Sequence, residues 1–163
     1  MKLQIVEESE FNKIEGVRQV IVHDYSHKFA TIDFGDILGR YGLSWRSTLV
    51  DPIVEFSTAQ NTLWIGVDRQ LAAICPQSGR LRLIMPLTSN ILQLLILDTL
   101  TVVLSENEVL IFNPNGSIRY SKSLPDIPEE ISIIGTDLVI NLLSGDSLTI
   151  NPQTGAFKQS ALA

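Results

Sequence analysis

Short runs of apolar and β-branched residues alternate with polar turns along most of this chain of 163 residues. Residues 91 to 121 show the pattern most clearly, with runs at 91–97, 100–104, 109–112 and 117–121. Each run has the length and residue types of a β-strand rather than of a helix. Four short strands joined by tight turns predict an antiparallel meander.

The same pattern occurs three times at a fixed distance. Three strand-like runs end at a proline that is followed within three residues by a glycine, and these are Pro76, Pro114 and Pro152. Successive prolines are 38 residues apart. A period of this size indicates a repeated supersecondary unit. We therefore expect three repeat units, at residues 52–88, 89–126 and 127–160.

The faces of the expected strands differ in polarity. The third strand of each unit keeps one apolar face, formed by the pairs Ala72/Ile74, Leu110/Phe112 and Leu148/Ile150. The second strand of the first unit, residues 62–67, is apolar on both faces, which predicts cover on both sides. In the last strand of each unit an apolar residue precedes a cation, at Leu81–Arg82, Ile118–Arg119 and Phe157–Lys158. We expect these apolar residues to point inward and the cations to protect an outer edge.

These features predict an all-β fold, a propeller-like array of four-stranded antiparallel meanders with a period of about 38 residues. A β-sandwich and a curved open sheet are the alternatives. We expect a single domain, residues 1–163, in which residues 1–50 form an atypical N-terminal blade or a cap. In that segment, strands are expected at 2–7, 17–24, 28–34 and 42–47, with a helical piece at 9–16. A third arrangement is an array that only a dimer completes.

Two segments, AICPQSGRLRL and IFNPNGSIRYSK, resemble the repeats of quinoprotein-like (PQQ-type) β-propellers. In those repeats a strand ends in an Asp-x-x-x-Gly-type turn, and a strand rich in Lys or Arg, usually ending in Trp, follows. The resemblance covers residues 52–160 and implies propeller blades. The Trp is absent, and the turn Asp is replaced by Cys75, Asn113 and Asn151. No quinone site or metal ligand set carries over, so the resemblance implies no cofactor.

Net charge, cysteine content and hydropathy limit the classes of partner and the compartment that we expect for this protein. The formal net charge of −6 argues against nucleic acid as a direct partner and suits a basic protein. One cysteine, Cys75, excludes an internal disulfide and fits a reducing compartment. The most apolar window, residues 91–104, is too short to span a bilayer, and the N-terminus turns acidic too early for a signal peptide. We expect a cytoplasmic protein without a membrane partner.

Both histidines, His23 and His27, lie in one short segment with Asp33 and Asp36 nearby. A metal site there would need a helix to place both imidazoles on one face. The flanking residues are typical of strands, so the segment is interpreted as a polar hairpin turn, and no metal or cofactor is expected. Cys75 lacks a basic neighbour in the sequence, and no serine-hydrolase elbow or phosphate-binding loop occurs. We therefore expect no enzyme, and a metal-dependent enzyme using the His23/His27 region is kept as an alternative.

Two segments are candidates for a contact surface. Residues 39–46 combine residue types that are enriched at binding hot spots, namely Arg40, Tyr41, Trp45 and Arg46. Asp126, Glu129 and Glu130, with Pro125 and Pro128, form a short acidic loop between the second and third repeat units. Core packing of Trp45 and a solvated connection are the simpler interpretations of these segments.

The function predicted is a non-catalytic protein-binding module, in its specific form an acidic inhibitor or immunity protein for a basic toxin or nuclease, because opposite charge speeds capture. A structural subunit that assembles with its own copies into a larger ring is the other alternative, so a homo-oligomer is also considered.

Overall fold

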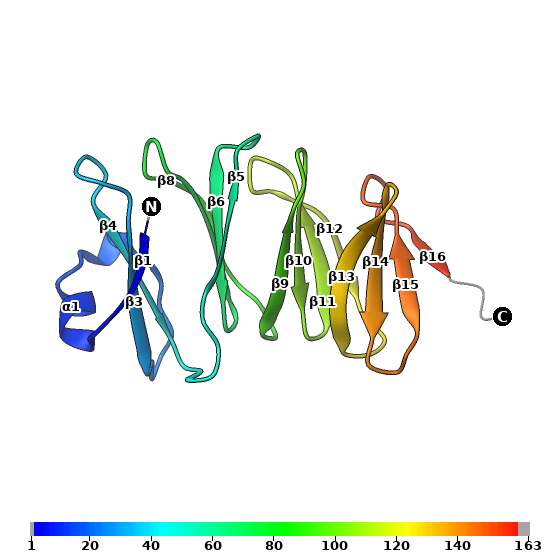
Figure 1. Ribbon diagram of the computed structural model, residues 1–163, viewed down its shortest axis with the longest axis horizontal. Helices are drawn as coiled ribbons and strands as arrows, with labels where there is room; N and C mark the ends of the chain where they lie inside the picture. The colour runs from blue at the N-terminus through cyan, green and yellow to red at the C-terminus, as the bar shows by residue number, and fades with distance from the viewer. Residues whose placement is uncertain (1, 160–163) are drawn as a thin grey trace. The chain divides into compact units, whose positions relative to one another are not determined.

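The computed structural model describes residues 2–159, which form four four-stranded sheets (Figure 1). The predicted all-β, propeller-like array of four-stranded sheets is confirmed. Contacts between residues divide the chain into two compact units, unit 1 (Met1–Asn90) and unit 2 (Ile91–Ala163). Each unit contains two of the sheets, and the two units are described separately.

The first sheet of unit 1 is not a meander. Its strands are β1 (Lys2–Val6), β2 (Gln19–Ile21), β3 (Lys28–Asp33) and β4 (Arg40–Trp45). They lie in the order β1-β3-β4-β2, and β2 runs parallel to β4. The expected strand at 17–24 is wrong in part, because a 3-10 helix occupies Gly16–Arg18 and leaves only three residues for β2. The expected hairpin at 23–27 is also wrong, because β4 lies between β2 and β3.

The second sheet of unit 1 is a regular antiparallel meander. Its strands are β5 (Ile53–Ser57), β6 (Thr62–Val67), β7 (Gln70–Cys75) and β8 (Arg80–Pro86). All six residues of β6 are buried, as its two apolar faces predict. The core of unit 1 lies between its two sheets and includes Leu43 and Trp45 from the first and Leu63, Ile65 and Ile74 from the second.

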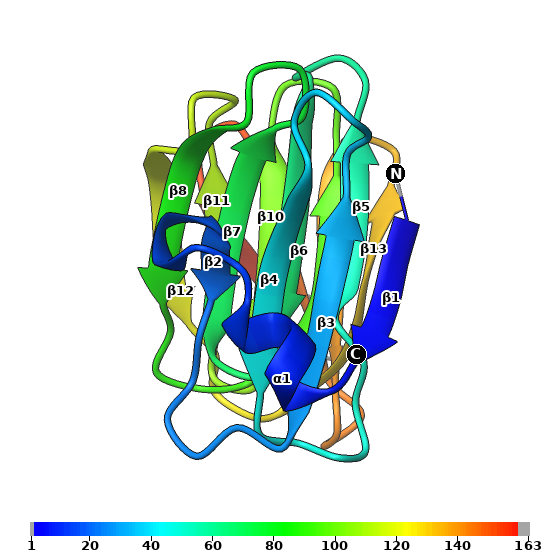
Figure 2. The ribbon, with the colours of Figure 1, turned by 90° about the vertical axis from the view of Figure 1, so that its left-hand side faces the viewer.

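A short helix covers the other face of the first sheet. Helix α1 (Glu8–Asn12) lies over β3 and β4 (Figure 2). Its Phe11 side chain is buried, and the ring centroid lies 5.3 Å from that of Phe29 in β3. Gly42 in β4 leaves room for this ring, since a Cβ at Gly42 would lie 2.9 Å from Phe11 Cε2. The sheet therefore has apolar cover on both faces.

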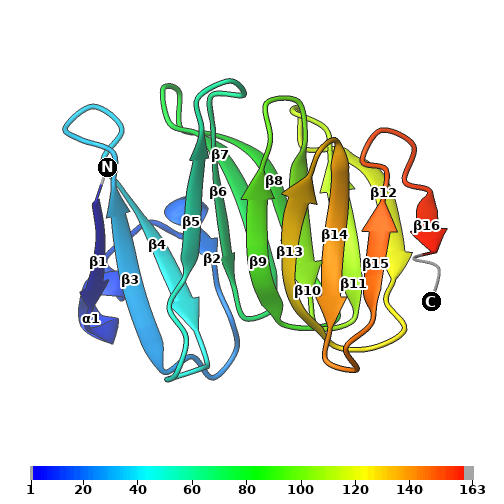
Figure 3. The same cartoon turned by 45° about the vertical axis from the view of Figure 1, so that its right-hand side comes forward.

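Unit 2 contains two further antiparallel meanders (Figure 3). The strands of the first are β9 (Ile91–Ile96), β10 (Thr101–Ser105), β11 (Glu108–Phe112) and β12 (Ile118–Ser123). Those of the second are β13 (Pro128–Ile134), β14 (Asp137–Leu142), β15 (Ser147–Ile150) and β16 (Phe157–Gln159). Ser160, the last residue of the third expected repeat unit, lies outside the described residues.

The core of unit 2 lies between its two sheets and includes Val102, Ile111 and Ile140. Two residues expected to point inward are exposed, Ile118 by 45% and Phe157 by 38%. A register shift between Ile111 and Phe112 places Ile118 opposite Phe112, away from this core, and Tyr120 packs against the core instead. Phe157 lies on the edge strand β16, where one side has no strand neighbour.

A tyrosine from the first sheet of each unit contacts a Pro-to-Gly turn of the second sheet. The Tyr41 hydroxyl donates to Gly79 O (3.3 Å), and the Tyr120 hydroxyl donates to Gln153 O (2.8 Å). A Cβ at Gly155 would lie 2.6 Å from two ring carbons of Tyr120, and a Cβ at Gly79 would collide with the Tyr41 hydroxyl. Both glycines also have positive φ, +71° at Gly79 and +70° at Gly155. At Gly79 and Gly155, the glycine thus serves both the turn and the tyrosine packed on it.

Candidate functional site

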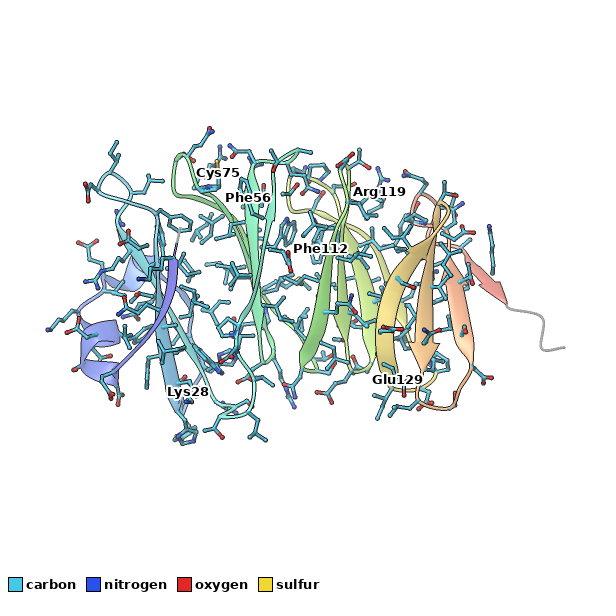
Figure 4. The ribbon with its side chains drawn as sticks, in the orientation of Figure 1. Lys28, Phe56, Cys75, Phe112, Arg119 and Glu129 are labelled. Atoms are coloured by element: carbon cyan, nitrogen blue, oxygen red, sulfur yellow. The ribbon has the colours of Figure 1, made fainter. Side chains whose placement is uncertain are left out.

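Three connections of unit 2 are joined by hydrogen bonds at one end of its sheets. Leu124 N in the β12–β13 connection donates to Asn107 O in the β10–β11 turn (2.9 Å). Leu143 N in the β14–β15 turn donates to Ile127 O (2.9 Å). We call this surface the acidic end of unit 2, defined by Glu106, Glu108, Asp126, Ile127, Glu129, Leu143 and Asp146. Glu129 is labelled at this end in Figure 4.

In the part of the chain that the structure describes, the carboxylates of the acidic end form no ion pair. Among residues 2–159, ion pairs form only between Lys13 and Glu10 and between Lys158 and Asp137. The net charge also concentrates in this unit. Residues 91–163 contain three Lys and Arg against eight Asp and Glu, whereas residues 1–90 contain nine against ten. The acidic end therefore presents uncompensated negative charge.

Asp126 also fixes the shape of this surface. Its carboxylate accepts hydrogen bonds from the backbone N–H groups of Ile127 (2.8 Å) and Ser144 (2.9 Å). These hydrogen bonds, with that of Ile127 the largest cause, lower the pKa of Asp126 below its usual value. The ionised side chain therefore connects the β12–β13 connection to the β14–β15 turn.

Two aliphatic side chains lie among these carboxylates. Ile127 is 49% exposed and Leu143 is 57% exposed, and their backbones are joined by the hydrogen bond described above. Pro125 and Pro128 flank Ile127 and restrict the backbone on both sides. An apolar pair within a charged surface has the composition of a small interface, with an apolar centre and a polar rim.

The predicted contact residues fall into both units. Trp45 is fully buried in the core of unit 1 and donates from Nε1 to Val50 O (3.0 Å), and Tyr41 is buried in the same core. Arg40 and Arg46 are the exposed members of that segment. In unit 2, Asp126 and Glu129 belong to the acidic end. Glu130 instead lies beside Asn141, whose Nδ2 donates to the Glu130 carboxylate (3.2 Å).

The His23/His27 region gathers no metal ligand set. In the part of the chain that the structure describes, no group of three or more His, Cys, Asp or Glu side chains could hold a metal ion. The topology explains why Asp33 does not join His27. His27 immediately precedes β3 and Asp33 is its last residue, so the two lie roughly 20 Å apart at about 3.3 Å per residue. The His23 side chain instead forms a hydrogen bond between its Nδ1 and the backbone carbonyl oxygen of Ser44 (2.7 Å).

Cys75 has a basic neighbour that the linear sequence did not reveal. The antiparallel pairing of β7 with β8 brings Arg82 near the thiol. Hydrogen bonds from the Ser78 hydroxyl and amide, then from the Gln77 amide and Arg82, lower the pKa of Cys75 to about 7, although burial raises it. Asn61 Nδ2 also lies 3.5 Å from Sγ. The expectation of a thiol without a basic neighbour is therefore corrected.

No protein-family model matches the sequence, and a search of the curated proteins found no match. Several solved structures are similar in fold. The N-terminal domain of Nup159 has a TM-score of 0.52 and 10% identity, over 66% of this chain and 33% of that chain. BamB from Moraxella catarrhalis has a TM-score of 0.53 and 16% identity, over 83% and 44%. The computationally designed protein Ika4 has a TM-score of 0.59 and 15% identity, over 72% and 76%.

This chain thus spans about a third of the Nup159 domain and less than half of BamB. Another structure contains Saccharomyces cerevisiae Dbp5 bound to Nup159. At these identities the likeness shows the fold alone, a β-propeller-like segment. In the described residues, no helix has both the length and the apolar character needed to cross a membrane.

Proposed function

We propose that this chain is a non-catalytic protein-binding module whose acidic end in unit 2 receives a basic surface of another protein. The observation that carries the proposal is the composition of that end. Its carboxylates form no ion pair within residues 2–159, the same connections carry two exposed aliphatic side chains, and hydrogen bonds hold the three connections together.

The two components of this surface contribute to binding in different ways. The carboxylates attract a cationic protein over a distance and speed its association, an effect that salt screens. A partner that covers Ile127 and Leu143 buries their exposed apolar surface. This burial favours binding by about 25 cal/mol per Å² of apolar area removed from water. The β12–β13 connection is already hydrogen-bonded to both neighbouring turns. Binding therefore costs little conformational entropy for ordering its backbone.

An acidic inhibitor or immunity protein, bound to a basic toxin or nuclease, is the specific form that we propose. Strong negative charge on one end of a small protein suits rapid capture of a cationic enzyme. The similarity in fold to Nup159, which is found bound to Dbp5, agrees with use of such a fold as a docking platform.

The proposal is tested by affinity capture from the native host at low salt with two charge variants. Asp126→Asn/Glu129→Gln/Asp146→Asn removes three charges from the acidic end. Glu7→Gln/Glu8→Gln/Glu10→Gln removes three from unit 1 and is the matched control. A basic partner should remain bound to the wild type and to the control, and should be lost from the acidic-end variant.

The captured partner is then purified and assayed with and without this chain. Loss of its enzymatic or toxic activity on addition of the chain would support the inhibitor form. The binding proposal fails if the wild type retains no protein at low salt, or if both charge variants lose the partner equally.

A further inference from the structure

A second, separate surface lies in unit 1. It is a cleft of about 690 Å³, within the size range of ligand-binding pockets. The β2–β3 connection, the segment after β4, the β6–β7 turn and the segment after β8 form its walls. Among its lining residues are Val22, Arg46, Arg69, Pro86, Leu87 and Asn90.

Hydrogen bonds hold Arg46 at two points. Its backbone N–H donates to Asp68 Oδ2 (2.7 Å), and its side-chain Nε donates to Asp24 O (2.5 Å). The Nε contact fixes the direction of the guanidinium group. Within residues 2–159 its two terminal nitrogens donate no hydrogen bond, and they form the edge of the guanidinium that can bind a carboxylate through two parallel hydrogen bonds.

The cleft also contains two acidic residues, Asp24 and Asp68, and in the described residues neither forms an ion pair with its arginines. Asp68 uses its carboxylate to accept the backbone N–H groups of Arg46 and Ser47 (2.7 and 3.2 Å). Asp24 contacts Arg46 through its backbone carbonyl rather than its carboxylate. Within residues 2–159, neither Arg46 nor Arg69 forms an ion pair. Two guanidinium groups on different connections thus line one cleft without a counter-charge at ion-pair distance.

We infer that this cleft binds an acidic peptide segment of a partner protein, with one carboxylate side chain at Arg46 and another at Arg69. Two separate cations match two side chains along a peptide better than they match one compact anion. Val22, Pro86 and Leu87 provide apolar contacts for the rest of the segment. Gln70 and Asn90, also in the lining, can hydrogen-bond to its backbone. This surface is independent of the acidic end of unit 2.

The test uses the full chain and a fluorescent peptide, Glu-Leu-Glu-Glu-Leu-Glu, with an amidated C-terminus. Its Gln counterpart lacks the carboxylates. Fluorescence anisotropy should detect binding of the Glu peptide to the wild-type chain. The same peptide should bind the Arg46→Gln/Arg69→Gln variant at least about tenfold more weakly. Arg40→Gln/Arg80→Gln changes the net charge of unit 1 equally and should leave the affinity unchanged. In NMR spectra, the Gln70 and Asn90 side-chain amides should shift during the titration.

Arg69→Gln alone is a second variant, in case the Arg46 change disturbs the fold. It should also weaken binding, because it removes one of the two proposed carboxylate contacts, and it should leave the fold intact, because the Arg69 side chain has no ion pair to lose in the described structure. Equal affinity for the Glu and Gln peptides, equal losses in both double variants, or no binding to the wild type would each overturn the inference. Pyrophosphate that displaces the peptide and binds more tightly would also overturn it, by assigning the cleft to phosphate.

Discussion

Gly79 and Gly155 show how a single residue type connects the two sheets of a unit. Each lies at the end of a Pro-to-Gly turn with positive φ, and each faces a tyrosine from the other sheet of its unit. Gly135 and Gly145 also have positive φ, but a Cβ at either would meet no atom within 4 Å. A glycine can be required for a left-handed backbone or for the close approach of a side chain. Gly135 and Gly145 meet only the first requirement, whereas Gly79 and Gly155 meet both.

Gly155→Ala and Gly135→Ala should differ in their effects on the free energy of unfolding. Both place alanine in a left-handed conformation, at a cost of about 1–2 kcal/mol. Gly155→Ala must also displace the Tyr120 ring, which adds about 1–3 kcal/mol. Urea denaturation of the two variants measures the difference. Equal destabilisation would show that Tyr120 moves aside without cost.

Cys75 should titrate near neutral pH. Hydrogen bonds to the thiolate lower its pKa from 9.0 to about 7, with the Ser78 hydroxyl the largest cause. The ultraviolet absorbance of the thiolate should therefore rise with a midpoint near pH 7, and Ser78→Ala should move the midpoint to higher pH. Cys75→Ser supplies the baseline. A midpoint near 9 in the wild type, or no change in Ser78→Ala, would contradict this assignment.

At the scale of the elements, the sequence predicted best where neighbouring strands are also neighbours in the chain. Strand β6 matches its expected bounds, residues 62–67, because an apolar run bounded by polar turns is a local signal. The parallel pairing of β2 with β4 joins segments separated by β3, and no local pattern contains that information. Helix α1 was expected in position, but its role as the cover of β3 and β4 depends on the tertiary packing of Phe11.

The same distinction applies to the candidate surfaces. The acidic loop at Asp126 and Glu129 could be read from the sequence because it is one continuous segment. Its hydrogen bonds to Asn107 and Ser144 come from two other turns, so the extent of the surface could not. The aromatic residues Tyr41 and Trp45 have the composition of a hot spot and the position of a core strand, and burial decided between these interpretations.

At the scale of the whole molecule, the polarity of the last sheet bears on self-assembly. The face of β13–β16 turned away from the core of unit 2 carries a row of hydrogen-bonded polar side chains. Asn141 donates to Glu130, and Ser147 donates to Asn141 (3.2 and 3.3 Å). Lys158 forms an ion pair with Asp137 (3.1 Å) on the same sheet. Stacking another sheet here would bury these groups away from water, which is unfavourable without new partners.

The chain should therefore sediment as a monomer of 18.1 kDa, rather than join copies of itself through this face. Ser132→Val/Thr149→Val tests the reason, because both residues flank Val139 in one row across the sheet. The variant would carry a continuous apolar row and should associate at concentrations where the wild type does not. Ser132→Thr/Thr149→Ser keeps the polarity and should remain monomeric. A stable wild-type oligomer in sedimentation equilibrium would favour the structural-subunit alternative and require a different contact surface.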